Sequence, residues 1–295
     1  MRGFKVLAPF NGISCGRVAL EKANIQVDRY VSYEIEEDAN KVAKANYPND
    51  EYNGDVFEAD FKQYKNFDLL MGGSPCTYWS IAKAGDNRET TSSGFGWELF
   101  MQYVRSFHES EAKWFIYENN ASISKEIQAE ITKQLKVQPL EINSADFSAQ
   151  ERKRLYWTNI PVELLTEKSN VVFDDIEYEH DYRTIDFNKY KDTMRVNQDG
   201  NIWSWDTSGK GYYSQQSRAR SKDIKMNTVP ASGGDKNNIY LGDCQYRKIH
   251  PIEAERLQTL PDNYTSCIKS NTKRIGLCEN GWTVDVIAYI LSFIK

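Results

Sequence analysis

Short apolar strands alternate with helical patterns through the first half of the chain, and this alternation constrains the fold more than any other feature of the sequence. The predicted strands cover residues 4–10, 27–35, 67–71, 114–117 and 155–158, with helices expected at 17–23, 36–46, 98–110 and 125–136. Strands separated by helices are typical of a parallel sheet that is covered on both faces. Ligands bind such sheets at the carboxyl ends of the strands, so the residues that follow each strand are the first candidates for a site.

The character of the chain changes beyond about residue 161. Residues 164–246 are polar, rich in Asp, Asn, Ser, Gly and Tyr, and lack a sustained helical period. A helical pattern returns at 248–260, and residues 284–294 form the most apolar stretch, typical of a core helix. A length of 295 residues exceeds what one hydrophobic core usually serves. We therefore predict a large domain of residues 1–161 plus 276–295, and a small, irregular or β-rich domain of residues 162–275.

Composition argues against several classes of protein. Five cysteines without a C-x-x-C pair, and only three histidines, make a disulfide scaffold and a structural zinc site improbable. Neither a long apolar run nor a secretory leader is recognisable, so we expect no membrane span and a reducing, cytoplasmic compartment. The net charge of −5 argues mildly against a generic nucleic-acid coat protein but allows a local basic groove.

Four residues near the ends of the first three strands could hold a small ligand. Gly12 and Gly16 lie in the turn after the first strand and allow a close approach to the backbone, although they do not fit the dinucleotide pattern G-x-G-x-x-G. Glu34 ends the second strand and could accept hydrogen bonds from two ribose hydroxyls. Asp55 follows a third, short strand and could accept one from an adenine amino group. A tight turn, a solvated glutamate and an ordinary turn aspartate are the alternatives.

The later strand ends carry groups suited to nucleophilic chemistry. Cys76 follows Ser-Pro in a polar, Gly-rich loop, which favours a reactive thiol over a buried apolar cysteine. Glu118 ends an apolar strand, where burial would keep the carboxyl protonated and able to donate a hydrogen bond; a glutamate facing water is the alternative. Arg152 and Arg154 enter the last strand two residues apart, so alternation would put both on one face, or they form a plain basic edge.

Taken together, these residues follow an order that resembles the DNA (cytosine-5) methyltransferases, from residue 6 to the C-terminus apart from about 162–225. Six motifs carry the resemblance: Phe10-x-Gly12-x-x-x-Gly16, Ser74-Pro75-Cys76, Glu118-Asn119, Gln150-x-Arg152-x-Arg154, Arg247-x-x-x-Pro251-x-Glu253-x-x-Arg256-Leu257-Gln258 and Asn280-Gly281-Trp282-x-Val284. Each motif alone is weak, but six in one order are specific. The chain departs from the family pattern at Asn11, Thr77, Asn120 and Asp285, where Asp, Gln, Val and Pro are common.

The resemblance implies the Rossmann-like sheet of the S-adenosylmethionine-dependent methyltransferases, with a smaller irregular or β-rich target-recognition domain. It also implies that Cys76 adds to carbon 6 of cytosine and that Glu118 stabilises ring nitrogen 3, while Arg154, with Arg152 nearby, holds oxygen 2. No metal is required for this chemistry. The residues expected to bind S-adenosyl-L-methionine are Phe10, Gly12, Ser14, Gly16, Glu34, Ile35, Asp55, Val56, Pro75, Asn280 and Trp282.

The substrate implied by the resemblance is double-stranded DNA, from which the target cytosine must be flipped. We expect the loop 77–96 to close over the flipped base, and the basic stretch 214–225 to contact the DNA backbone with some base readout; a solvated face is the alternative for the latter. We expect the protein to act as a monomer in a bacterial or phage-infected cell, with or without a partner restriction enzyme. The candidate DNA-binding residues are Ser80, Lys83, Arg88, Arg218, Arg220 and Lys222.

Four other functions remain as alternatives. Methylation of cytosine in RNA, such as tRNA, uses nearly the same catalytic motifs, although the sizeable inserted region favours DNA. A catalytically weak DNA-binding relic is disfavoured because Cys76, Glu118 and Arg154 are all present. A zinc deaminase would need H-x-E and P-C-x-x-C, which the sequence lacks. An amino-methyltransferase would carry a Pro-Pro-Tyr/Trp loop where this chain has Pro-Cys.

Overall fold

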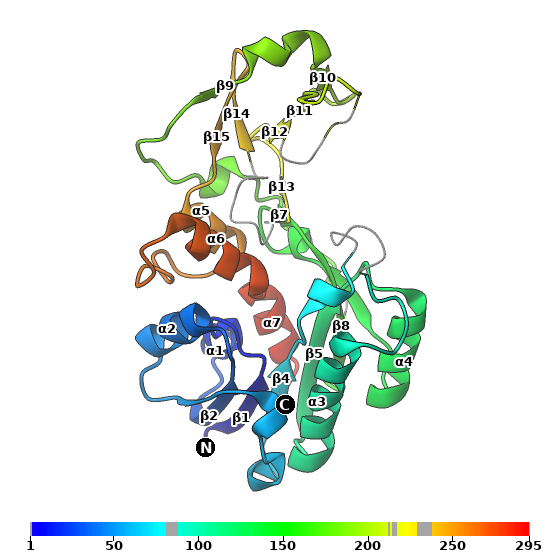
Figure 1. The fold of residues 1–295 in the computed structure, drawn as a ribbon. Helices are drawn as coiled ribbons and strands as arrows, with labels where there is room; N and C mark the ends of the chain where they lie inside the picture. Colours follow the sequence, from blue (N-terminus) through cyan, green and yellow to red (C-terminus); the bar gives the residue numbers. More distant parts are fainter. Residues whose placement is uncertain are drawn as a thin grey trace. The chain divides into compact units, whose positions relative to one another are not determined.

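The computed structural model describes residues 2–80, 88–163, 165–211, 213, 217–228 and 238–294. Within these residues the chain forms two larger sheets and one short two-stranded sheet (Figure 1). Its contacts divide the chain into two compact units. The first unit comprises Met1–Asn143, Lys153–Leu164 and Val284–Lys295, and the second comprises Ser144–Arg152 and Leu165–Thr283.

The first unit is built on a seven-stranded sheet with the order β3-β2-β1-β4-β5-β8-β6. Five neighbouring strands run parallel, as the alternating sequence predicts, whereas β8 is antiparallel to both β5 and β6. Residues on β1 such as Val6, Leu7 and Ala8 are successively buried, which requires cover on both faces of the sheet. The strands are β1 (Phe4–Pro9), β2 (Val27–Tyr33), β3 (Glu51–Asn53), β4 (Leu69–Gly72), β5 (Trp114–Asn120), β6 (Leu140–Asn143) and β8 (Lys153–Thr158).

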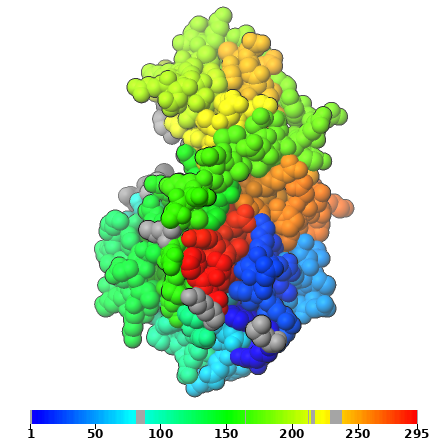
Figure 2. Space-filling view, turned by 180° about the vertical axis from the view of Figure 1, so that it is seen from behind, coloured from blue at the N-terminus to red at the C-terminus, as the bar shows by residue number. Residues whose placement is uncertain are grey.

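Five helices of the first unit cover this sheet. The last of them, α7, is the most apolar stretch of the sequence, and it packs against α1, so that the C-terminal segment lies beside the N-terminal one in Figure 2. The sequence predicts this return of the C-terminal helix to the large domain. The helices are α1 (Cys15–Lys22), α2 (Glu37–Asn46), α3 (Phe95–Ser110), α4 (Lys125–Leu135) and α7 (Val284–Leu291).

The second unit contains a six-stranded sheet of short strands in the order β10-β11-β12-β14-β15-β9, together with a two-stranded pairing of β7 with β13. Its helices α5 (Pro251–Leu257) and α6 (Asn271–Asn280) pack against each other. The short, polar strands explain why this region shows no clear period in the sequence. They are β7 (Gln150–Glu151), β9 (Ile185–Asp186), β10 (Arg195–Val196), β11 (Ile202–Ser204), β12 (Arg218–Arg220), β13 (Met226–Asn227), β14 (Asn238–Gly242) and β15 (Gln245–Lys248).

The unit boundaries differ in two places from the domains expected from sequence. Residues Ser144–Arg152 belong to the second unit, because β7 pairs with β13 there. The final return to the first unit occurs at Val284 instead of residue 276, because α6 packs with α5. In the part of the chain that the structure describes, no helix is long and apolar enough to cross a membrane. Those residues also contain no cluster of three or more metal-ligating side chains.

Candidate active site

The loop between β1 and α1 has an unusual backbone held by side chains. Phe10, Gly12 and Ser14 all have positive φ angles, of 57°, 55° and 63°. Asn11 spans the loop, because its amide donates to Ser14 Oγ at 2.7 Å and its Oδ1 accepts from the Tyr30 hydroxyl at 2.9 Å. An amide can donate and accept at once, whereas a carboxylate only accepts. This bridge gives a physical reason for Asn11 at a position where the family usually has Asp.

Glu34 connects this loop to the end of β2. Its Oε2 accepts a hydrogen bond from Gly12 N at 2.8 Å, and its Oε1 accepts one from Glu36 N at 2.8 Å. The next residue, Ile35, is 75% exposed, a large apolar side chain at the edge where ligands of such sheets bind. Gly16, also predicted as a cofactor residue, is buried in the first turn of α1.

Asp55 and Val56 follow β3 and begin a short 3-10 helix. Asp55 caps that helix by accepting from Phe57 N at 2.9 Å, while Val56 is buried. Phe57 is 42% exposed and stacks on Phe95, 46% exposed, with ring centroids 6.1 Å apart. This exposed aromatic pair was not predicted from the sequence, because its two residues lie far apart along the chain. Phe57 could have been singled out as a candidate ligand contact, because it directly follows Asp55 and Val56.

The loop after β4 presents Cys76 at the start of a single 3-10 turn. Pro75 precedes this turn, and the Cys76 carbonyl accepts hydrogen bonds from Trp79 N and Ser80 N at 3.0 and 2.9 Å. The thiol of Cys76 is not in a disulfide and is partly exposed, as nucleophilic attack on a ligand requires. Ser80, a predicted DNA contact, is half-buried at the end of this turn.

A buried network of polar side chains supports the loop that bears Cys76. Ser74 Oγ lies 2.7 Å from the Tyr117 hydroxyl, and Asn119 Nδ2 donates to both that hydroxyl and the Ser74 carbonyl. Burial raises the pKa of Tyr117 well above its ordinary value, so the hydroxyl stays protonated and can donate. The network fixes the backbone immediately before Pro75 and Cys76.

Glu118, at the end of β5, forms an ion pair with Arg154 of β8. Arg154 Nε lies 3.0 Å from Glu118 Oε1, and the two side chains are only 7% and 12% exposed. The carboxyl that the sequence expects to be kept protonated by burial therefore has a guanidinium partner. A Cβ added at Gly73 would lie 2.8 Å from the Glu118 carbonyl oxygen and 3.0 Å from its Oε2. Only glycine at position 73 allows Glu118 to approach the loop that bears Cys76.

Arg152 takes different partners from Arg154. It is 4% exposed and donates to the carbonyls of Glu279 and Gly281, at 2.9 and 3.1 Å. The strand is interrupted at Arg152, between β7 and β8, so simple alternation does not describe the pair. In the structure, Arg152 holds the end of α6, where the predicted cofactor residues Asn280 and Trp282 lie.

Arg88 and Glu89 close the base of the loop that follows Cys76. The Arg88 guanidinium donates to the carbonyls of Trp79 and Ser122, at 2.9 and 2.6 Å. Glu89 Oε2 accepts from Trp79 Nε1 at 3.2 Å and from Gly96 N at 3.1 Å. Arg88, a predicted DNA contact, is thus engaged within the protein, whereas Glu89 was not singled out from sequence. Lys83 lies outside the described residues.

The basic stretch of the second unit is largely engaged in internal contacts. Arg220 donates to the Lys225 carbonyl at 2.8 Å, and its pKa is lowered by burial. Lys222 Nζ lies 2.6 Å from Asp174 Oδ1, and this contact raises the lysine pKa. Arg218 is exposed, and its guanidinium makes one long hydrogen bond, to the Tyr213 carbonyl at 3.4 Å. Among the three cations predicted to contact DNA here, Arg218 is the one best placed to meet a ligand.

The departure at Asp285 also has a local explanation. Asp285 lies in the first turn of α7, and its Oδ1 is 2.6 Å from the Nζ of Lys22, in the last turn of α1. A negative charge is favoured at a helix N-terminus and a positive charge at a helix C-terminus. Asp285 therefore joins the two helices electrostatically.

Comparison with known proteins identifies the class of this fold and then the family. The architecture is that of the Rossmann-like methyltransferases. A methyltransferase of Entamoeba histolytica, EhMeth, matches with a TM-score of 0.72 at 14% identity, covering 99% of this chain and 98% of that one. The S. pombe Dnmt2 methyltransferase matches with a TM-score of 0.70 at 17% identity and the same coverage. At these identities the likeness shows the fold alone.

The sequence comparisons are more specific. The family model for C-5 cytosine-specific DNA methylases matches residues 4–295, and the chain belongs to this family. The type II methyltransferase M.HhaI of Haemophilus parahaemolyticus is 26% identical over 321 aligned residues, covering 98% of this chain and 94% of that protein. The orphan methyltransferase M.SPRI of Bacillus phage SPR is 31% identical over 179 residues, which cover 56% of this chain. The chain spans 39% of that phage protein's length, and 36% of the related M.Rho11sI of Bacillus phage rho11s.

Proposed function

We propose that the protein is a DNA cytosine-5 methyltransferase that methylates carbon 5 of a flipped-out cytosine within a short, specific DNA sequence. The observation that carries this proposal is the arrangement around Gly73, where the Glu118–Arg154 pair packs against the loop that presents Cys76. A thiol, a carboxyl and a guanidinium group are the three groups that addition to a cytosine ring needs.

The residues at the ends of β1, β2 and β3 fit S-adenosyl-L-methionine as the cofactor. Gly12 and Glu34 would hold the polar part, Asp55 would accept from the adenine amino group, and the exposed face of Ile35 would pack on the adenine ring. When bound, this cofactor supplies an electrophilic methyl group carried on a sulfonium sulfur. The side chain of Ile35 is 75% exposed and follows the carboxylate of Glu34. A flat ligand with a polar edge, such as an adenosine group, would cover this apolar surface.

The residues of the chain would perform the ring chemistry in two stages. The Cys76 thiolate forms a bond from Sγ to carbon 6, and the electron pair of the 5–6 double bond makes carbon 5 nucleophilic. Glu118 and Arg154 stabilise the charge that develops at nitrogen 3 and oxygen 2. After carbon 5 has gained the methyl group, a base removes its proton, the double bond re-forms and Sγ leaves as the thiolate.

The target base reaches these groups only after leaving the duplex, which costs a few kcal/mol. The loop whose base is closed by Arg88 and Glu89 would cover the extruded base, and exposed Arg218 would contact the DNA backbone. Replacing Arg218 with Gln is expected to weaken DNA binding and to lower the slope of log K against log salt by about one. An unchanged slope would move the contact to another part of the second unit.

The test of the proposal is methylation mapping in a host without cytosine methylation. Bisulfite sequencing of the DNA of cells expressing the wild-type chain should reveal 5-methylcytosine in one short sequence context. Cys76→Ala should abolish it, while Cys267→Ala, which changes an exposed cysteine, should leave it intact. Methylation confined to RNA of the same cells would establish the RNA alternative, and activity retained by Cys76→Ala would refute the proposed nucleophile.

Covalent trapping tests the chemistry directly. A duplex with 5-fluorocytosine at the mapped target, incubated with S-adenosyl-L-methionine, should form an adduct on Cys76, because carbon 5 then carries no removable proton. Glu118→Gln is expected to lower turnover by orders of magnitude while changing DNA affinity little. Glu111→Gln, an exposed glutamate on the same unit, serves as its control. Wild-type turnover in Glu118→Gln would remove the carboxyl from the mechanism.

A further inference from the structure

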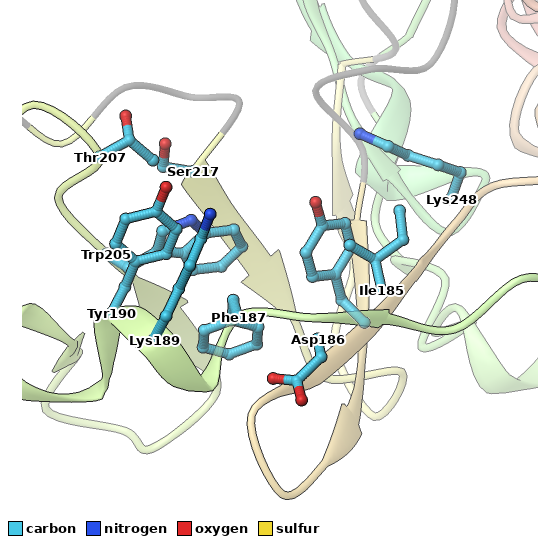
Figure 3. Close-up of a pocket in the computed structure, with 10 residues that line it drawn as sticks. Ile185, Asp186, Phe187, Lys189, Tyr190, Trp205, Thr207, Ser217 and Lys248 are labelled. Carbon is cyan, nitrogen blue, oxygen red and sulfur yellow. The ribbon is translucent and has the colours of Figure 1, made fainter.

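The six-stranded sheet of the second unit contains a pocket that none of the chemistry above uses. Its volume is about 420 Å³, within the range of pockets that bind small molecules (Figure 3). All of its lining residues belong to the second unit. The lining residues that the structure describes are four aromatic side chains, two lysines, one carboxylate, two aliphatic hydroxyls and an isoleucine: Ile185, Asp186, Phe187, Lys189, Tyr190, Trp205, Thr207, Ser217, Tyr246 and Lys248.

Four aromatic side chains are among the described residues that line this pocket. Phe187 and Trp205 are 1% and 3% exposed and stack with ring centroids 4.2 Å apart. Tyr246 stacks on Trp205 at 5.3 Å, and partly buried Tyr190 packs against the same small core. The buried pair fixes the base of the pocket, so the tyrosines are held in place as a surface on which a flat ring can stack.

Two lysines face each other across the opening. In Figure 3, Lys189 lies with Tyr190 and Trp205 on one side, and Lys248 lies with Ile185 on the other. Each ammonium also lies near an aromatic ring, since Lys189 Nζ is 4.8 Å from the Tyr190 centroid and Lys248 Nζ is 5.5 Å from that of Tyr246. Among the described residues that line the pocket, two lysines stand against a single carboxylate, that of Asp186, so their formal charges sum to a positive value.

We propose that this pocket binds one unpaired nucleotide, with its base against the aromatic side chains that line the pocket and its phosphate between Lys189 and Lys248. Aromatic faces stack on any nucleobase, and paired ammonium groups neutralise a phosphate. The positive charge of the two lysines disfavours a cationic ligand. The proposal rests on the proposed function, because the nucleotide would belong to the nucleic acid that the protein methylates.

Single-stranded nucleic acid without cytosine tests the pocket separately from the active site. A fluorescent 12-residue oligonucleotide of adenine and thymine is titrated with the full chain, alone and as its duplex, and binding is followed by anisotropy. The single strand is expected to bind wild type. Tyr190→Leu, which keeps bulk but removes the ring, should weaken single-strand binding by about 5-fold or more and leave duplex binding unchanged.

Charge variants provide the matched comparison. Lys189→Gln should lower the salt dependence of single-strand binding, with a slope reduced by about one. Lys191→Gln, an exposed lysine on the same 3-10 helix but outside the pocket lining, should leave binding as in wild type. Thermal unfolding monitors whether each variant retains the folded state.

The outcomes separate this proposal from the proposed function. Single-strand binding that is equal in wild type, Tyr190→Leu and Lys189→Gln would overturn the nucleotide pocket even if the protein methylates DNA. Binding that depends on Tyr190 would support the pocket even if no cytosine is methylated. Adenosine 5′-monophosphate is the second probe: if it displaces the strand from wild type and not from Tyr190→Leu, the same pocket also accepts free nucleotides.

Discussion

Glu89 holds the two ends of the loop after Cys76 together, and its removal should weaken that closure by a measurable amount. Its Oε2 accepts hydrogen bonds from the indole of Trp79, which is fully buried, and from the backbone of Gly96. Glu89→Ala leaves both donors without this acceptor, at a cost of about 1–3 kcal/mol each. For the two donors together, we therefore expect the free energy of unfolding to fall by about 2–6 kcal/mol. Glu89→Gln keeps an acceptor oxygen and should lose about 1 kcal/mol.

Urea unfolding measures the stability change, and hydrogen exchange on peptides that contain Trp79 and Gly96 tests whether the loss is local to the loop base. Under the proposed function, turnover should fall together with exchange protection at Trp79 and Gly96. Glu98→Gln, which changes an exposed carboxylate in the first turn of α3, is the control. A Glu89→Ala variant within about 0.5 kcal/mol of wild type, with unchanged exchange at Gly96, would refute this reasoning.

Three further predictions concern the first unit. Arg154→Met leaves nearly buried Glu118 without its cation and should lower the free energy of unfolding by about 3 kcal/mol, less when combined with Glu118→Gln; strictly additive losses in urea unfolding would contradict the pairing. Burial raises the pKa of Asp50 from 3.8 to about 6, so the folded state holds its proton more tightly and stability falls as pH rises from about 4 to 6. Asp50→Asn should flatten that decline by about 1–2 kcal/mol, and an unchanged difference between urea midpoints at pH 4 and pH 7 would argue against it. Gly73→Ala should displace Glu118 and reduce kcat while calorimetry shows unchanged S-adenosyl-L-methionine affinity; wild-type kcat would show that the close approach is dispensable.

The sequence predicted the first unit well because its elements have strong local periods. Apolar strands and amphipathic helices alternate, so the parallel sheet and the placement of Cys76 and Glu118 at strand ends follow from local pattern and the rules of parallel sheets, whereas the strand order was not predicted. The antiparallel direction of β8 was not predicted by this reasoning. Its direction depends on pairing with both β5 and β6, which local pattern does not reveal.

A second limit on prediction from the sequence is that many side chains have partners far away along the chain. Arg152 and Arg154 are two residues apart, which predicts that both lie on one face of a strand. The strand is interrupted at Arg152, however, and Arg152 donates to carbonyls of residues far along the chain. A run of basic residues in a sequence suggests cations available to a ligand. In the fold, however, Lys222 forms an ion pair with Asp174, and Arg220 donates to the Lys225 carbonyl. The number of basic residues in such a run is therefore larger than the number of cations that can contact a ligand.

The passage of Ser144–Arg152 through the second unit has a consequence for engineering. The chain crosses between the units four times, and β13 obtains its strand partner from this short detour and not from the long segment that carries the six-stranded sheet. A chimaera that exchanged residues 165–283 alone would separate β13 from its native partner β7. Exchanging the second unit between relatives therefore calls for two grafts, one of them only nine residues long.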